Sequence, residues 1–394
     1  MNKDLLVIDA DGHYVENVAA WAARMPANLR DRAPKLIIEN GREHFTIGDL
    51  YCLPSKGANL MGGMTMGDGM SARKRGNDAP ELRGRLVSES DLPGRDPVAR
   101  LKMMDEEGMA ISVLFPTMGL ACFTAIPDPT LVHPLATALN DWLIDDFCAA
   151  DPKRLVPVAT LPLHDPAEAA RELERCAKKG VKAAWMSPVP VMGRTIDHRD
   201  HDIVWAKAAE LGITMTTHHG SGGGISKAMG RDRNNTWLGS HAMGHSFEAM
   251  AAIVGLYTSR VFQRFPTIKW GFMEAGCGWL PFWLHQIHEH AERMRFLLPD
   301  LPEDEEIIDI FHDRCFLTAE ADDPLINAAL DAGGERCMVW ASDFPHFDCS
   351  MPGVAQELRD RTDLPPARLK ALASTNAIEF FGLQNLVSAA AAAS

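Results

Sequence analysis

A repeated alternation of short apolar runs with longer helical patterns most constrains the fold of this chain. The apolar runs are continuous rather than alternating with polar residues, which is typical of strands buried on both faces. We expect strands at residues 5–9, 111–115, 155–160, 181–186, 213–217, 268–273, 314–318 and 337–341. We expect helices between them at residues 130–150, 166–179, 201–211, 245–265, 280–296 and 323–332. Eight such units predict an α/β protein with a closed (β/α)8 TIM barrel, and the alternative is an open doubly wound sheet.

Two segments lie outside the eight units. Residues 18–96 form a long insertion after the first strand, rich in glycine, proline and charge. Within it, residues 61–70 contain mostly methionine and glycine, a composition that suits a mobile surface loop, a lid or a subunit contact. Residues 354–383 have an amphipathic helical pattern that we expect to pack against the barrel. The 394 residues are thus predicted to form a single barrel domain over 1–394, with one insertion and a C-terminal helical extension.

Composition excludes several classes of protein. With 46% hydrophobic and 23% charged residues, the chain is not expected to be disordered or fibrous. The formal net charge of −14 repels phosphate backbones and anionic lipid, so neither nucleic acid nor membrane is an expected partner. The eight cysteines contain no Cys-x-x-Cys pair, and no signal-peptide pattern precedes the first apolar run. These features predict a cytoplasmic protein that acts on a small molecule, and we expect a homo- or hetero-oligomer.

Ionisable residues stand at the ends of four of the expected strands. In a TIM barrel, functional side chains come from the C-terminal ends of the strands. Asp11 and His13 follow the first strand, His218 the fifth, Glu274 the sixth and Asp343 the eighth. One such residue alone is more often a hydrogen-bonding group of the core, but four strand ends together favour a shared ligand. Carboxylates and imidazoles that converge in this way are the ligands of Zn²⁺, Mn²⁺ or Fe²⁺.

Five further residues are candidates for the same site. Glu16 is a candidate for an outer shell or a second metal ion, or a cap for the segment that follows it. Glu320, after the seventh strand, is a further acid or a surface turn residue. His245 is expected to begin the helix before the sixth strand, where it faces the barrel mouth or serves as a cap. His346 and His241 are candidates for binding the substrate.

The order and spacing of these motifs resemble the amidohydrolase-related family, which includes aminocarboxymuconate-semialdehyde and γ-resorcylate decarboxylases. The similar segments are 8–13 (IDADGH), 96–101 (DPVARL), 104–108 (MDEEG), 218–222 (HHGSG), 265–266 (FP), 274–279 (EAGCGW), 340–346 (WASDFPH) and 376–383 (NAIEFFGL). The resemblance covers nearly the whole chain and implies a TIM barrel. It also implies that Asp11, His13, His218 and Asp343 bind a divalent metal ion.

The chain departs from the family pattern at two positions. Asp11 stands where the family has histidine or glutamate. Glu274 stands where the family has a histidine that acts as a base or orients groups in the decarboxylases. Oxygen ligands in place of nitrogen make the site harder, which favours manganese or iron relative to zinc. The change at Glu274 also counts against the decarboxylase hypothesis in particular.

The leading hypothesis is a metal-dependent enzyme that hydrolyses or decarboxylates a small carboxylated organic substrate. Asp343 would act as the proton shuttle, first base and then acid, while Glu274 would orient water or substrate. The carboxylates are sufficient for two metal ions, so a second hypothesis is a dinuclear iron or manganese–iron oxygenase that hydroxylates a small molecule, as in a minority branch of the superfamily. A third is a non-catalytic barrel subunit of a hetero-oligomer. The expected cofactor is one or two ions of manganese, iron or zinc per chain.

Overall fold

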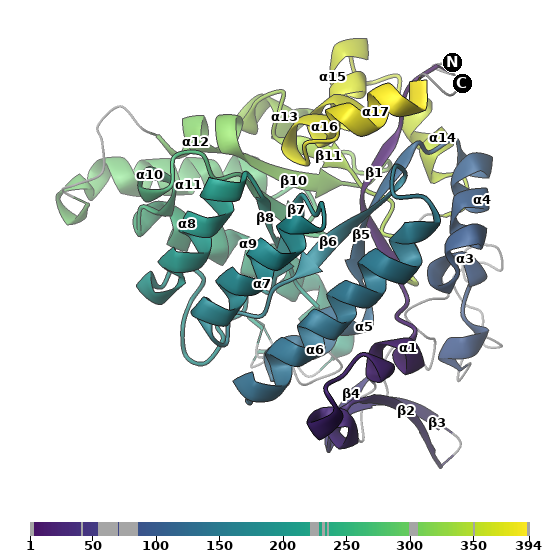
Figure 1. Ribbon diagram of the computed structural model, residues 1–394. Helices are drawn as coiled ribbons and strands as arrows, with labels where there is room; N and C mark the ends of the chain where they lie inside the picture. The colour runs from purple at the N-terminus through teal and green to yellow at the C-terminus, as the bar shows by residue number, and fades with distance from the viewer. Residues whose placement is uncertain are drawn as a thin grey trace.

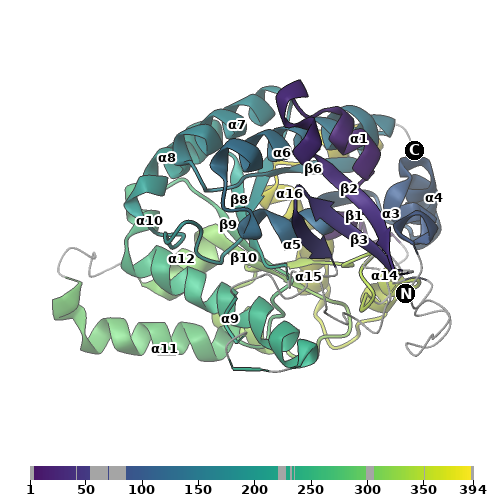
Figure 2. The same cartoon turned by 90° about the horizontal axis from the view of Figure 1, so that it is seen from below.

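The computed structural model describes residues 4–40, 42–53, 70, 86–220, 228–230, 233–234, 236–298, 306–349 and 351–391. Eight parallel strands at its centre form a nearly closed barrel, and helices surround it (Figures 1 and 2). In the order of their pairing, the strands are β1 (Ile8–Tyr14), β5 (Ile111–Pro116), β6 (Leu155–Thr160), β7 (Ala183–Met186), β8 (Thr214–His218), β9 (Trp270–Met273), β10 (Cys315–Ala319) and β11 (Met338–Trp340). Spatial order equals chain order, as the predicted TIM barrel requires.

The barrel closes between its first and last strands through the residues that follow β11. The backbone N–H of His13 donates to the carbonyl of Phe344 (2.7 Å), and that of Asp343 donates to the carbonyl of Asp11 (3.0 Å). The buried carboxylate of Asp9 accepts hydrogen bonds from the backbone N–H (3.0 Å) and the hydroxyl (2.9 Å) of Ser342. These bonds replace a regular strand ladder where β1 meets β11, so the open-sheet alternative is wrong.

The helices cover the outer face of the barrel because each presents an apolar side to the strands. They begin where the sequence supplies a cap: Asp165, for example, accepts hydrogen bonds from the N–H groups of Ala167 and Glu168 at the start of α7. The helices of the repeating units are α4 (Pro97–Glu107), α6 (Pro129–Trp142), α7 (Pro166–Lys178), α8 (Asp202–Leu211), α9 (Trp237–Thr258), α10 (Val261–Arg264), α11 (Leu280–Arg293), α12 (Ile307–Arg314) and α13 (Ile326–Gly333).

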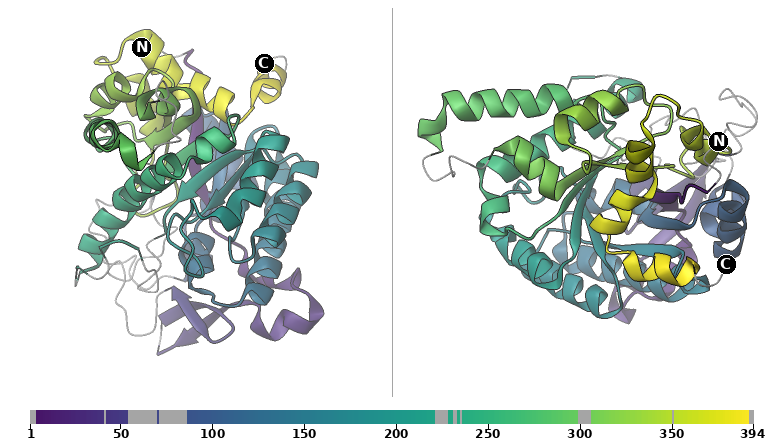
Figure 3. Two further views of the ribbon diagram at one scale, coloured as in Figure 1. Left: turned by 90° about the vertical axis from the view of Figure 1, so that its left-hand side faces the viewer. Right: turned by 90° about the horizontal axis from the view of Figure 1, so that it is seen from above.

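The insertion after β1 contains a small antiparallel sheet. Its strands are β2 (Pro34–Glu39), β3 (Arg42–Ile47) and β4 (Leu50–Leu53), preceded by α1 (Val18–Ala23) and followed by α3 (Leu92–Arg95). This sheet lies at the end of the molecule toward which β1 runs, at the bottom of Figure 1 and of the left view of Figure 3. The methionine- and glycine-rich stretch 61–70 lies outside the described residues except for Met70, so its role stays a prediction.

The C-terminal helices lie at the opposite end of the barrel, near both chain termini (Figures 1 and 3). They are α14 (Val354–Arg359), α15 (Pro366–Lys370), α16 (Asn376–Phe380) and α17 (Gln384–Ala391). Leu372, Phe380 and Leu383 are buried in the common hydrophobic core, so this segment packs against the barrel as expected. In the part of the chain that the structure describes, no helix combines the length and apolar character needed to cross a membrane.

Two predicted element boundaries are wrong in ways that affect the site. The first strand begins at Ile8 rather than residue 5 and continues to Tyr14, because Gly12 and His13 pair with Leu114 and Phe115 of β5. His245 does not begin a helix, since α9 starts at Trp237 and places it well inside. The first turns of α9 contain glycine, serine and histidine, so apolar residues do not recur there at the helical spacing that would have indicated a helix.

Candidate metal centre

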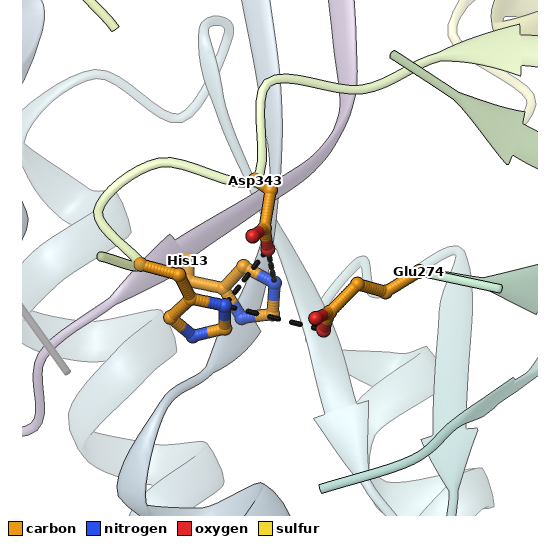
Figure 4. Close-up of side chains that lie close together, drawn as sticks. His13, Glu274 and Asp343 are labelled. Carbon is orange, nitrogen blue, oxygen red and sulfur yellow. Dashed lines mark ion pairs between the residues drawn. The ribbon is translucent and has the colours of Figure 1, made fainter. Parts of the chain in front are cut away.

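Five side chains from four strand ends converge at the end of the barrel toward which the strands run. Nε2 of His13 lies 3.5 Å from Oδ1 of Asp11 and 3.3 Å from Oδ1 of Asp343. Nε2 of His218 lies 3.5 Å from Oδ1 of Asp11 and 3.5 Å from Oε2 of Glu274. Figure 4 shows His13, Asp343 and Glu274 pointing toward one another. The structure therefore brings together all five residues that the sequence placed at the barrel mouth.

Both histidines are oriented by hydrogen bonds through their other ring nitrogen. Nδ1 of His13 lies 2.9 Å from the carbonyl oxygen of Pro116, and Nδ1 of His218 lies 2.9 Å from that of His219. A carbonyl only accepts, so each Nδ1 carries the proton and each Nε2 keeps its lone pair. Histidines that bind metal ions are held in this way by a partner behind the ring.

The atoms that face the centre have no hydrogen-bond partners among the described residues. They are both carboxylate oxygens of Asp11, Nε2 of His13, Nε2 of His218 and Oδ1 of Asp343, and all are buried. Burial of unpaired carboxylate and imidazole lone pairs is costly unless a cation binds them. Groups of these donors lie close enough to hold one metal ion, and His13 belongs to two such groups. The residues thus fit a divalent metal ion.

The backbone is strained at the two carboxylates that follow β9 and β11. Glu274 has a backbone φ of 45° and Asp343 has a φ of 53°, in the left-handed region that residues other than glycine rarely adopt. Such a conformation costs about 1–3 kcal/mol and persists where surrounding contacts hold it. Here the backbone N–H of Glu274 donates to Oγ1 of Thr318 (2.8 Å). The backbone N–H of Asp343 donates to the backbone carbonyl of Asp11 (3.0 Å). The strain turns both carboxylates inward.

Burial and mutual repulsion shift the charges of the site. Burial lowers the pKa of His13 to about 4, so its ring is neutral. Burial and the neighbouring carboxylates, Asp343 first, raise the pKa of Glu274 well above its usual range. His346 lies 2.8 Å from Asp343. Burial opposes the charge of His346, but the carboxylate of Asp343 outweighs it and raises the pKa of His346. Burial likewise opposes the charge of Asp343, but His346 and His13 outweigh it and lower the pKa of Asp343. Asp343 and His346 thus form a buried ion pair, with the proton on the imidazole of His346.

A cavity of about 430 Å³ opens beside this centre. Seven carboxylates line it: Asp11, Glu274, Glu320, Asp322, Asp323, Asp343 and Asp348. His241 and His245 of α9 line it as well. Among the described residues, neither lysine nor arginine lines it, so the cavity has a negative potential that favours cations.

The structure places the five further candidates at different distances from the centre. His346 belongs to the group formed by His13, Glu274 and Asp343, and His245 and His241 form another group with Glu274. Glu320 lines the cavity, where burial and Asp343 raise its pKa to about 8.

Glu16 does not join these groups. Its carboxylate accepts hydrogen bonds from the backbone N–H groups of Thr117 (3.1 Å), Met118 (2.9 Å) and Gly119 (2.8 Å). It therefore caps α5 (Met118–Cys122), whose free N–H groups bind a carboxylate well. A role of Glu16 beside a second metal ion stays a prediction, and the segment that it caps follows β5 rather than Glu16 itself.

Sequence reasoning missed Asp348. Asp348 lines the cavity, and Nε2 of His241 lies 3.9 Å from its Oδ2. Its position five residues after Asp343 was a signal that the loop after β11 carries a second acid. Arg100 is buried beneath the site and donates from Nη2 to the carbonyl of His13 (2.6 Å). It supports the backbone of β1 and does not face the cavity.

With this geometry established, comparison with known proteins decides the family. The amidohydrolase family model matches residues 8–383, nearly the whole chain. The chain belongs to the amidohydrolase family. It is therefore a barrel enzyme of that superfamily, and the resemblance in its motifs is confirmed.

Several members of the amidohydrolase family are similar to this chain. The γ-resorcylate decarboxylase of Polaromonas sp. JS666 is 27% identical over 78% of this chain and 91% of its own length. An amidohydrolase of Mycobacterium avium subsp. paratuberculosis has a TM-score of 0.78 at 21% identity, over 98% of this chain and 99% of its own. A dihydroxybenzoic acid decarboxylase of Polaromonas, solved with manganese and the inhibitor 2-nitroresorcinol, has a TM-score of 0.63 at 20% identity, over 96% and 97% of the two chains. The two solved structures confirm the barrel fold.

Proposed function

We propose that this protein is a metal-dependent decarboxylase of small aromatic carboxylates. The observation that carries the proposal is the set of unpaired donors of Asp11, His13, His218 and Asp343 at the mouth of the barrel. The curated relatives support it, because the γ-resorcylate decarboxylase of Polaromonas aligns with most of this chain. Manganese is the favoured ion, since two of the four donors are carboxylates and a related structure contains manganese.

A divalent ion at this centre supplies positive charge that polarises the oxygens of a bound substrate. This charge is essential here, because the cavity is lined by carboxylates and, among its described residues, by no lysine or arginine. A carboxylated substrate would otherwise be repelled on entry. The arrangement therefore predicts that substrate binding, as well as turnover, depends on the metal ion.

Loss of CO₂ from an aromatic acid replaces a carbon–carbon bond with a carbon–hydrogen bond and consumes one proton. His346 holds a proton at the site, 2.8 Å from the carboxylate of Asp343. Asp343 would deliver this proton to the carbon that loses CO₂, and His346 would supply Asp343 from behind. Glu274, whose Oε2 lies 4.0 Å from Nδ1 of His346, would orient the substrate. This assignment explains why His346 and Asp343 are buried together.

The proposal is tested with a panel of hydroxybenzoates and the manganese-loaded protein. We expect loss of the carboxylate and release of one CO₂ per product with at least one member, and none after chelation. The matched control is the H285A variant, which changes an exposed histidine of α11. Metal-loaded protein that releases no CO₂ from any hydroxybenzoate would contradict the proposal.

The same assay separates the two other reactions. Hydrolysis would release an alcohol, amine or acid from ester, amide or lactone substrates without CO₂. The oxygenase alternative predicts O₂ uptake that depends on the substrate and stops without oxygen. Decarboxylation proceeds without O₂, so an anaerobic assay distinguishes it from oxidation.

A further inference from the structure

His245 lines the cavity beside the metal centre, and both of its ring nitrogens lack hydrogen-bond partners among the described residues. Its side chain is only 10% exposed. A buried imidazole with two unpaired nitrogens is costly unless another molecule binds them. Oε1 of Glu274 lies 3.5 Å from Nδ1 of His245 but forms no hydrogen bond with it. The ring therefore offers free hydrogen-bonding atoms to a molecule in the cavity.

Neighbouring groups fix the position of this ring. The ring of His241, one turn earlier on α9, lies 4.7 Å away between centroids, and that of His219 lies 5.1 Å away. The residue after His245 is Ser246, which donates from Oγ to the carbonyl of Ala275 (2.7 Å) and so joins α9 to the segment after β9. A side chain that its neighbours already hold in place loses little conformational freedom when it binds a ligand.

One small aromatic molecule can contact both the metal centre and His245. The two oxygens of Glu274 face Nε2 of His218 and Nδ1 of His245, each at 3.5 Å. The two imidazoles are thus separated by one carboxylate group and its contacts. The cavity volume of about 430 Å³ is in the range of sites for small organic ligands. An aromatic ring that binds the metal ion through its carboxylate can therefore place a substituent at His245.

The chemistry of the cavity selects the kind of substituent. Burial, with His219 and His241 nearby, lowers the pKa of His245 well below its ordinary value, so the ring is neutral and offers one N–H donor and one lone pair. A hydroxyl group both donates and accepts, so it fits either nitrogen. A second carboxylate is disfavoured, because seven carboxylates line the cavity and, among its described residues, no lysine or arginine does. A carbon substituent would leave the nitrogens unpaired.

We propose that His245 binds a ring hydroxyl group of the substrate and so selects aromatic acids that carry this group. The inference deepens the proposed function and rests on it, because it concerns the substrate of the same site. It assigns His245 to substrate binding rather than to proton transfer. Loss of the His245 nitrogens is therefore expected to raise KM for a hydroxylated substrate more than it lowers kcat.

The test compares ligands that differ by one hydroxyl group and cannot lose CO₂. Manganese-loaded protein is titrated with 2-nitrophenol and with its singly hydroxylated derivatives, which include 2-nitroresorcinol, the inhibitor in the Polaromonas structure. We expect at least one derivative to bind the wild type at least about 10-fold more tightly than 2-nitrophenol does, because a missing hydroxyl leaves a buried partner unpaired. The H245F variant keeps an aromatic ring without its nitrogens and should lose this preference.

The H245Q variant retains a donor and an acceptor at this position and should keep part of the preference. The H285A control, on the exposed face of α11, should keep all of it, and all proteins are compared at equal manganese content. Wild-type protein that binds no derivative more tightly than 2-nitrophenol would overturn the proposal, as would an H245F variant with the wild-type preference. If H245F loses the preference but no hydroxybenzoate releases CO₂, only the proposed function fails.

Discussion

The backbone N–H of Asp343 donates to the carbonyl of Asp11, 3.0 Å away. This bond lies where the barrel closes, between β1 and the residues after β11. It also joins two of the carboxylates that face the metal centre. The same hydrogen bond therefore closes the barrel and positions two carboxylates of the metal centre. A change that weakens the contact between β1 and the residues after β11 should reduce both metal affinity and the stability of the fold.

Replacement of Asp343 by asparagine tests its role in proton transfer. The amide keeps the shape of the side chain but cannot relay a proton from His346, which lies 2.8 Å from the carboxylate. We expect the D343N variant to lose at least about 100-fold in kcat, the lower range for a general acid or base. The rate of CO₂ release from the best hydroxybenzoate measures this. Equal rates for D343N and wild type at equal manganese content would exclude Asp343 as the proton donor.

A methyl group at Gly12 tests the packing behind the metal centre. A Cβ there would lie 2.3 Å from Oδ2 of Asp9 and 2.5 Å from Oγ of Ser112, which hydrogen-bond to each other at 2.8 Å. We expect the G12A variant to be less stable by about 1–3 kcal/mol, as for overpacked cores, and to bind manganese less tightly.

Thermal melting and manganese titration measure the two effects of G12A. Gly180 is a useful reference, because it has φ of +95° and open space around its Cβ position. The G180A variant therefore shows the cost of backbone strain without a collision. If G12A melts at the temperature of the wild type, the collision behind the site is not significant.

Removal of the metal ion should destabilise the fold. A ligand that binds only the native state stabilises it by about 4 kcal/mol at a thousandfold excess over its Kd. We expect Tm to fall on chelation and to recover when Mn²⁺ is added. In the H218A variant, which lacks one unpaired donor, the added Mn²⁺ should raise Tm less. An equal rise in H218A and wild type would place the stabilising ion elsewhere.

Acid should destabilise the protein partly through His164. Burial lowers the pKa of His164 from its ordinary value of 6.5 to about 4, and its Nε2 lies 2.8 Å from the carbonyl of Ile126. The unfolded chain then binds more protons than the native protein between pH 6.5 and 4, so stability falls as the pH falls through this window. The full effect of this group is about 3 kcal/mol at pH 4.

The measurement for His164 is Tm as a function of pH. The H164Q variant lacks the titrating ring, so its Tm should decline less than that of the wild type between pH 6.5 and 4. The H290Q variant makes the same change at an exposed position of α11 and should decline as the wild type does. Parallel curves for H164Q and wild type would show that His164 is not a source of the acid sensitivity.

The sequence by itself determined the barrel and the centre of its site. Short continuous apolar runs are typical of strands buried on both faces, and their alternation with helices indicates a parallel order. The C-terminal ends of parallel strands meet on one face, so Asp11, His13, His218, Glu274 and Asp343 could be placed together from their positions after strands. Each of these inferences rests on local pattern, which one chain displays directly.

Only the tertiary structure decided which other polar residues belong to the site. Glu16 turns away because N–H groups after β5, remote in sequence, bind its carboxylate. His241 and His245 approach Glu274 because α9 begins earlier than its apolar pattern. Asp348 reaches the cavity from an irregular loop. Such contacts depend on how distant segments pack, and no periodicity in the sequence encodes them.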